Sequence, residues 1–241
     1  MNLRNGLVLA CIALMLAACA ATPDEQPEPV GYEVWQEADH IIYRGLMLEE
    51  AVEEVAQLLR QHGNSINWLA IESPGGDVMI GMDLGELVHE HDLNVKVVNT
   101  GCHSSCANYV FTAGRLKVIE EGATVTWHGS ALQHSLRTAT RVQRRATPSP
   151  RRLLNRIKAR QKEFFERIGV DARITIVGQD LNCRCVWALS ADDMARFGLE
   201  NIEVPDNYSE IVAAEAETSR YMRLLSLPDD VFERIRPPED A

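Results

Sequence analysis

The sequence predicts an α/β fold built from stacked βαβ units. Between residues 40 and 114, short apolar strands alternate three times with segments whose apolar residues recur at helical spacing. Glycine-containing links follow the second and third strands, which is typical of connections to a crossover helix. The chain has 241 residues, 46% hydrophobic and 24% charged, which is enough for one sizeable core.

The first half of the chain carries the regular alternation. Apolar runs bounded by polar or turn residues predict three strands, and amphipathic periodicity predicts the helices between them. The strands are expected at 40–45, 66–73 and 94–100, and the helices at 48–64, 77–92 and 104–114.

The second half is less regular. Residues 116–130 predict two short strands with a turn between them, ending at His128. A long basic amphipathic helix is expected at 151–169, a shorter helix at 171–180, and a small helix capped by Ser190 at 189–199. Residues 38–206 are therefore taken as the main domain, and 207–241 as a C-terminal helical extension with a disordered tail.

The N-terminus is typical of a signal peptide, here residues 1–18. Arg4 precedes an apolar run from Gly6 to Ala18 whose 13 residues are short for a membrane span, which needs about 20. The ending "LAAC" resembles the bacterial lipoprotein signal, which implies lipidation of Cys19 as the first mature residue. Ala20 is not acidic, which implies the outer membrane facing the periplasm. Residues 19–37 are then predicted to be an acidic, Pro-rich tether.

Charge argues against a nucleic-acid partner. Without residues 1–18 the chain loses one of 24 basic residues and none of 35 acidic ones, so its formal net charge is 23 − 35 = −12. The segment 137–167 is the exception, because it contains eleven Arg or Lys and only two acidic residues, Glu163 and Glu166. This stretch is either a solvated helix face or a patch for anionic partners such as phospholipid head groups or acidic peptides.

The cysteines favour disulfides in an oxidising compartment. Loss of Cys11 with the signal and lipidation of Cys19 leave an even number, which allows three pairings. The four that remain are Cys102, Cys106, Cys183 and Cys185. A zinc site built from all four is the less favoured alternative. No cofactor is expected, and haem attachment finds no support because there is no CxxCH.

Three polar loops follow predicted strands, where reactive groups gather in open α/β sheets. Acyl transfer by serine needs a nucleophile, a base, a group that orients the base, and N–H donors for the oxyanion. The loops "SPGG" at 73–76, "GCHSS" at 101–105 and "TWHGS" at 126–130 offer backbone donors, Ser105 and His128 for these roles.

These segments together resemble the ClpP-type serine peptidases. The resemblance runs from "IIYRG" through "IESPGGDVMIGMDLGELV" and "GCHSSCANYVFTAG" to "ATVTWHGS", with an "LSADDMARFGL" ending. It implies a ClpP/crotonase-like fold and hydrolysis of peptide bonds without a cofactor. Ser105 is implied as nucleophile, His128 as base, and Gly76 and Cys106 as oxyanion donors. The family also implies a peptide or protein substrate and self-association. It further implies that the basic stretch forms a contact between subunits.

The third position of the triad departs from the family. Asn182 stands where the family has an aspartate, and Asp180 lies two residues earlier. An asparagine carbonyl accepts a hydrogen bond from the imidazole but does not stabilise the imidazolium, and such an exchange can cost about 10⁴-fold in rate. A catalytically impaired binding or scaffold protein is therefore the main alternative.

The resemblance also implies a disulfide across the site. Cys183 and Cys185 flank Asn182, while Cys102 and Cys106 flank Ser105, so a bond from one pair to the other is expected. Closing that long loop would stabilise the fold by a few kcal/mol.

Four narrower alternatives stay open. Ser104 is expected to be a helix cap or a small packing residue, and His103 is a less favoured base. Acyl-CoA chemistry of the crotonase type conflicts with an envelope location. A Ser/Lys dyad would have to use Lys96 or Lys117.

Overall fold

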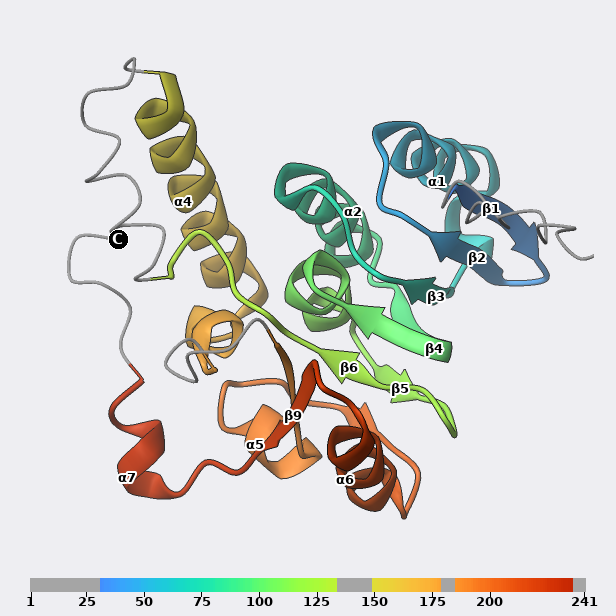
Figure 1. The fold of residues 1–241 in the computed structure, drawn as a ribbon. Helices are drawn as coiled ribbons and strands as arrows, with labels where there is room; N and C mark the ends of the chain where they lie inside the picture. The colour runs from blue at the N-terminus through green and yellow to red at the C-terminus, as the bar shows by residue number, and fades with distance from the viewer. Residues whose placement is uncertain (1–30, 134–148, 179–184, 236–241) are drawn as a thin grey trace, which may run out of the picture. The chain divides into compact units, whose positions relative to one another are not determined.

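A seven-stranded sheet forms the centre of the computed structural model, which describes residues 31–133, 149–178 and 185–235 (Figure 1). Its strand order is β1-β2-β3-β4-β5-β8, and β6 pairs with the far end of β4. β1 is antiparallel to β2, and the other pairs are parallel. The strands are β1 Tyr32–Glu37, β2 His40–Gly45, β3 Trp68–Ser73, β4 Asn94–His103, β5 Lys117–Ile119, β6 Val125–Thr126 and β8 Ile202–Glu203.

The remaining elements cover the sheet or follow it. They are α1 Glu49–His62, η1 Gly63–Ser65, α2 Val78–Glu90, η2 Cys106–Phe111, α4 Ser149–Ile168, η4 Ala172–Ile176, β7 Val186–Leu189, α5 Ala191–Ala195, α6 Tyr208–Thr218, β9 Met222–Leu225 and α7 Asp229–Phe232. The α/β class and the parallel βαβ units expected from the alternation are confirmed. Figure 1 shows α2 lying between α1 and α4.

The central strands are apolar because helices cover them. Leu69 and Ile71 of β3 and Val95 and Val97 of β4 are fully buried. α1 turns Ala51, Val52, Val55 and Leu59 inward at helical spacing and leaves its glutamates exposed. The core therefore follows the periodicity of the sequence.

A change of register brings the polar loops to one edge of the sheet. β3 and β4 pair regularly from Trp68↔Asn94 to Ile71↔Val97, and the next pair is Ser73↔Cys102. β4 is thus bulged over 98–101, and β3 and β4 end side by side. The loop after Ser73 and the turn after His103 therefore lie next to each other.

The N-terminal boundary differs from the expectation. Residues 19–37 were predicted as a tether, but Tyr32–Glu37 form β1 and pair with β2 over six residues. The alternation of Tyr32, Val34 and their polar neighbours is that of an edge strand. The Pro-rich segment before it obscured this signal, and the tether residues 19–30 lie outside the described residues.

The C-terminal extension adds a strand to the fold. β9 pairs in parallel with β7 from Val186↔Met222 to Leu189↔Leu225. β7 is joined to the sheet through Trp127 and Trp187, whose backbones exchange hydrogen bonds of 2.8 and 2.7 Å. Neither β7 nor β9 was expected from the sequence, and the described residues from Gly31 onward belong to one compact unit.

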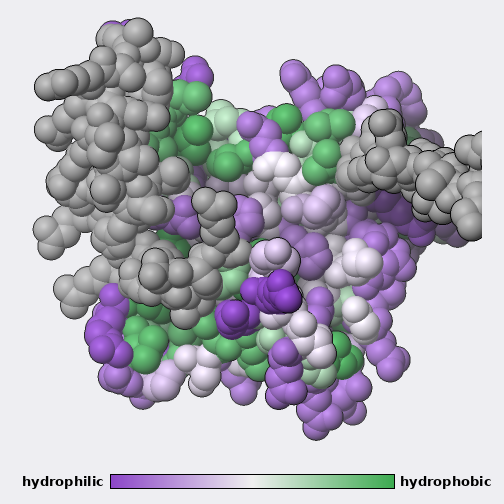
Figure 2. Space-filling view, in the orientation of Figure 1, coloured by the Kyte–Doolittle hydropathy of each residue, from purple (hydrophilic) through white to green (hydrophobic). Residues whose placement is uncertain are grey.

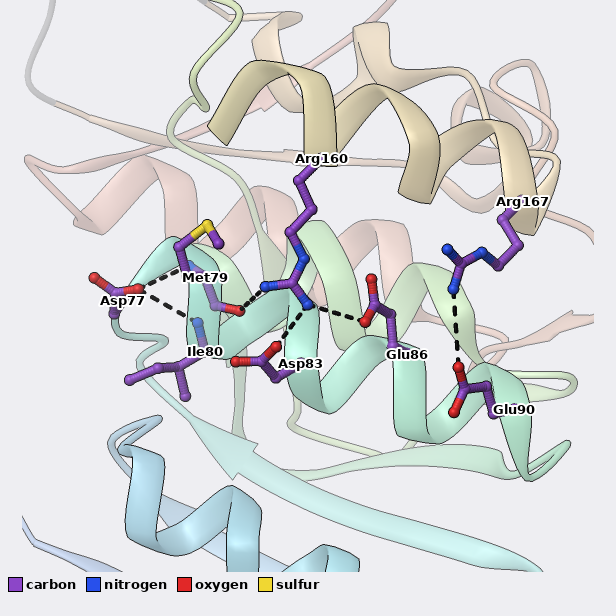
Figure 3. Close-up of polar contacts among 8 residues, drawn as sticks. All are labelled: Asp77, Met79, Ile80, Asp83, Glu86, Glu90, Arg160 and Arg167. Atoms are coloured by element: carbon purple, nitrogen blue, oxygen red, sulfur yellow. Dashed lines mark hydrogen bonds and ion pairs between the residues drawn. The ribbon is translucent and has the colours of Figure 1, made fainter. Parts of the chain in front are cut away.

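The basic helix α4 is clamped to α2 by ion pairs (Figure 3). Arg160 donates to Asp83 at 2.5 Å, to Glu86 at 2.9 Å and to the Met79 carbonyl at 3.3 Å. Arg167 reaches Glu90 at 3.8 Å. Part of the positive charge of the basic stretch thus neutralises the acidic face of α2.

The face shown in Figure 2 mixes hydrophilic and hydrophobic residues, with hydrophilic ones along its upper and lower right edges. Within the described ranges, no helix combines the length and apolarity that a bilayer span requires.

We expect Arg160→Ala to lower the free energy of unfolding by about 2 kcal/mol, because it removes charge-assisted bonds from a largely buried guanidinium to the exposed Asp83 and the partly buried Glu86. Lys162→Ala is the matched control. Lys162 is well exposed, and its ion pair with Glu166 is long, at 4.0 Å, so its loss should cost less than about 0.5 kcal/mol. Urea unfolding measures both. Equal losses in the two variants would show that the clamp contributes nothing specific.

Candidate active site

A serine and a histidine face each other at the edge where β4 and β6 end. The Oγ of Ser104 lies 2.8 Å from Nε2 of His128. The parallel pairing of His103 with Thr126 brings the two segments together, and the Ser104 N–H donates to the Thr126 carbonyl at 2.9 Å. With the imidazole proton on Nδ1, the Ser104 hydroxyl donates to Nε2, which is the arrangement that nucleophilic catalysis by serine requires.

Ser104 has an unusual backbone conformation. Its φ is +58°, in the left-handed region that few residues other than glycine adopt. A disulfide joins Cys102 to Cys106 with 5.3 Å between their Cα atoms, so Ser104 is the central residue of a closed five-residue loop. Strained turns of this kind cluster at functional sites.

The predicted nucleophile, Ser105, has a different environment. Its hydroxyl donates to the carbonyl of Gly76 at 2.9 Å, and only 3% of the residue is exposed. The Cβ of Ser105 packs against Gly81 of α2, which has no room for a side chain there. The structure therefore brings His128 to Ser104 and not to Ser105.

The helix after the serines begins with free backbone donors. The Asn108 N–H donates to the Ser104 carbonyl at 2.8 Å and is the first bond of this helical segment. The N–H groups of Ser105, Cys106 and Ala107 therefore have no acceptor within the helix. Such donors favour negative charge beside the Ser104 hydroxyl.

The "SPGG" loop approaches the same point. A Cβ on Gly75, at φ +94°, would lie 2.8 Å from the Ser104 Cβ and 3.0 Å from the Ser105 nitrogen, so only glycine fits. The Gly75 carbonyl accepts from Met47, on the side of β2. Because C=O and N–H point in opposite directions in a trans peptide, the Gly76 N–H points toward the side of β4 and Ser104.

A family model described as Clp protease matches residues 35–199, which is well over half of the chain. The chain belongs to the Clp protease family. No curated protein matches it significantly. Its fold is thus the expected ClpP/crotonase-like one.

Solved structures resemble this chain at low identity. Two variants of the 1510-N membrane-bound stomatin-specific protease, the second in complex with a substrate peptide, are each 12% identical, with TM-scores of 0.45 and 0.46. The matches cover 78% and 80% of this chain and 96% and 93% of theirs. A methylmalonyl CoA decarboxylase is 10% identical over 44% of this chain and 51% of its own, at a TM-score of 0.33.

His103, the alternative base, is engaged elsewhere in this Clp-family domain. Its Nδ1 lies 2.7 Å from the Thr126 hydroxyl and its Nε2 lies 3.2 Å from the Thr100 carbonyl. Burial lowers the pKa of His103, which favours a neutral ring donating from Nε2. His103 therefore stabilises the β4–β6 junction rather than facing either serine.

The lysines of a Ser/Lys dyad lie at the opposite end of β4. Lys117 pairs with Val95, and Lys96 follows in the same strand, so both are roughly 25 Å from Ser104 at the usual rise per residue. Burial lowers the pKa of Lys117 to about 8, and its Nζ donates to the Glu200 carbonyl at 3.0 Å. Neither lysine reaches the serines.

The third triad position lies outside the described residues, together with Asn182, Asp180 and Cys183. In the described ranges no side chain hydrogen bonds to Nδ1 of His128. β7, which follows that segment, is held beside His128 by the pairing of Trp127 with Trp187.

The expected disulfide across the site is wrong, because Cys102 and Cys106 bond to each other. Cys185 is also disulfide-bonded, and its partner lies outside the described residues. Among the described residues no group of three or more His, Cys, Asp or Glu is arranged to hold a metal ion. The bonded pair also removes two of the thiolates that the zinc alternative needs.

Two residues of the site were missed from the sequence. The sequence favours Ser104 as a helix cap or a small packing residue, although its central place in the CxxxC spacing is a signal that could single it out. The other is Asn108, whose Nδ2 donates to the Gly129 carbonyl, next to His128, at 2.9 Å. Nothing in the sequence pattern indicates that contact.

We expect the tryptic peptide 97–115 of the unreduced protein to be two hydrogen masses lighter than its reduced form, because both its cysteines are bonded internally. Replacing both Cys102 and Cys106 by Ala should lower the free energy of unfolding by about 2 kcal/mol, the loop-entropy value for so short a loop. A cross-linked peptide joining 97–115 to Cys183 or Cys185 would contradict the pairing.

Proposed function

We propose that this protein is a serine peptidase in which Ser104 is the nucleophile and His128 the general base. The 2.8 Å contact between Ser104 Oγ and His128 Nε2 carries the proposal. Ser104 is half-buried and His128 exposed, so a substrate can reach them, whereas Ser105 is buried and donates to a carbonyl. Membership of the Clp protease family supports peptide bonds as the substrate class.

The reaction follows from these positions. Nε2 of His128 takes the hydroxyl proton as Ser104 Oγ attacks the substrate carbonyl, forming a tetrahedral intermediate. The N–H of Gly76 and the free N–H groups at Ser105 and Cys106 stabilise its oxyanion. Protonated His128 then donates to the leaving amine as the peptide C–N bond breaks. Water, deprotonated by His128, hydrolyses the acyl-enzyme and releases Ser104.

The third residue of the catalytic triad determines the rate that we expect for the enzyme. Asn182 offers a carbonyl oxygen to Nδ1–H of His128 but no negative charge for the imidazolium, and Asp180 would supply that charge in its place. With Asn182 in the role, we expect a slow enzyme. Self-association likewise remains a prediction of the resemblance.

We also propose that the protein is lipid-anchored through Cys19 in the bacterial envelope, on the outer membrane facing the periplasm. The "LAAC" sequence at residues 16–19 motivates this. The disulfides at Cys102–Cys106 and Cys185 support it, because disulfides persist in oxidising compartments and are rare in the cytoplasm.

We expect a fluorophosphonate probe to label the full chain, and Ser104→Ala to abolish the label. His128→Ala should slow labelling by about 100-fold or more, because the general base is lost. Ser105→Ala is the matched control. It removes a hydroxyl one residue away and should keep the label while lowering the free energy of unfolding by about 1 kcal/mol.

The converse pattern, with the label lost in Ser105→Ala and kept in Ser104→Ala, would overturn the assignment. A folded, disulfide-intact parent that neither takes the label nor hydrolyses a fluorogenic peptide pool would favour the scaffold alternative.

We expect radioactive palmitate to be incorporated into the full chain in a bacterial host and to be lost in Cys19→Ala. Cys11→Ala, within the predicted signal, is the control and should retain the lipid. Equal incorporation in parent and Cys19→Ala, or none in either, would refute lipidation at Cys19.

A further inference from the structure

Asn108 contacts both segments that carry the reacting groups. It lies in η2, and 2% of it is exposed. Its backbone N–H donates to the Ser104 carbonyl at 2.8 Å, and its side-chain Nδ2 donates to the Gly129 carbonyl at 2.9 Å. One residue thus binds the nucleophile's turn and the loop of the base.

The orientation of the Asn108 amide follows from its partner. A carbonyl only accepts hydrogen bonds, so Nδ2 must face Gly129. Oδ1 then points the other way, and it is buried without a hydrogen-bond partner among the described residues. A buried acceptor without a partner destabilises the folded state, so an apolar side chain would suit this position better if packing were its only role.

Other contacts fix the His128 loop farther along the chain. Gln161 of α4 donates to the Ser130 hydroxyl at 3.0 Å, and Thr175 of η4 lies 2.8 Å from the same oxygen. Gln133 donates to the His128 carbonyl at 3.0 Å from within the loop. Of these contacts, only that of Asn108 comes from the helix that begins at the nucleophile.

The contacts close a circuit. Ser104 Oγ meets His128 Nε2, His128 is bonded covalently to Gly129, Gly129 accepts from Asn108, and Asn108 donates back to Ser104. Loss of the Asn108 side-chain amide breaks this set of contacts at the Gly129 carbonyl. The imidazole could then move relative to the hydroxyl, although every other hydrogen bond named here would remain.

We propose that Asn108 is a positioning residue that sets the distance between Ser104 and His128. The inference rests on the proposed function for its effect on rate, but the geometry it describes does not require catalysis. Asn108 touches neither substrate nor reacting atoms. It acts by holding the loop of the base against the helix of the nucleophile.

Asn108→Leu tests this in the full chain, because leucine is similar in size and removes both the donor and the unpartnered oxygen. Thr112→Val is the matched control. Thr112 is 2% exposed, lies in the same helical segment, and donates to the Asn108 carbonyl at 2.7 Å without reaching the His128 loop. Both variants lose one buried hydrogen bond, and thermal unfolding confirms that both are folded.

Fluorophosphonate inactivation separates binding of the probe from the chemical step. We expect the maximal inactivation rate to fall about 10- to 100-fold in Asn108→Leu, the effect of a small misplacement of a base, with the half-saturating probe concentration changed less than about threefold. Thr112→Val should stay within about threefold of the parent in both. A parental inactivation rate in Asn108→Leu would overturn the proposal.

NMR of the imidazole tests the geometry independently of activity. The His128 ring signals, assigned by their absence in His128→Ala, should shift or broaden in Asn108→Leu and match the parent in Thr112→Val. If the His128 signals shift in Asn108→Leu but the parent does not react with the fluorophosphonate, the positioning role stands and the peptidase proposal is refuted. If the His128 signals are unchanged in Asn108→Leu while the parent reacts with the fluorophosphonate, the positioning role is refuted and the peptidase proposal stands.

Discussion

The five-residue loop closed by Cys102 and Cys106 is the constraint on which the rest of the site depends. β4 must turn sharply into η2, and it does so through Ser104 in the left-handed region, which costs a residue with a Cβ about 1–2 kcal/mol. The disulfide limits the backbone conformations that the turn can adopt, and both of its cysteines are fully buried. With the turn fixed, the Ser104 side chain faces His128 and the Ser105 side chain faces α2. The local backbone therefore decides which hydroxyl is available for chemistry.

The sheet supplies the other parts of the site through the ends of its strands. The bulge in β4 lets Ser73 pair with Cys102, so the Gly75–Gly76 peptide reaches the start of η2. The short ladder of β4 with β6 then brings His128 to the same edge. The proposed nucleophile, base and backbone donors thus come from three segments that are distant in sequence. Their meeting point follows from the parallel order of β3, β4 and β6, as expected for a sheet of this class.

Periodicity predicted the elements that bury a regular apolar face, and it failed where the signal was short or mixed. β7 and β9 have four residues each, too few to show a period, and β1 follows a Pro-rich segment. The proposed choice of Ser104 over Ser105 rests on local backbone geometry, which a sequence pattern does not show. The ungapped spacing from Gly76 places Ser105 at the family's nucleophile position, whereas the left-handed turn at Ser104 brings the Ser104 hydroxyl to His128 and leaves the buried Ser105 hydroxyl on the Gly76 carbonyl. The cysteine pairing failed because proximity at a site does not choose among four thiols, whereas a 5.3 Å Cα separation does.

The basic stretch acts first within the fold, through two consecutive residues of α4. Arg160 binds the start of α2, which follows the Gly75–Gly76 loop, and Gln161 binds Ser130 in the loop of the base. Adjacent residues of one helix therefore contact two different elements, α2 through Arg160 and the loop of His128 through Gln161. Gln161 is fully buried and its amide is bonded at both ends, to Ser130 and to Tyr109, whose pKa burial raises. The charge that singled out this segment in the sequence therefore acts, in part, within the fold, because Arg160 binds the carboxylates of α2 while its uncharged neighbour Gln161 binds the loop of His128.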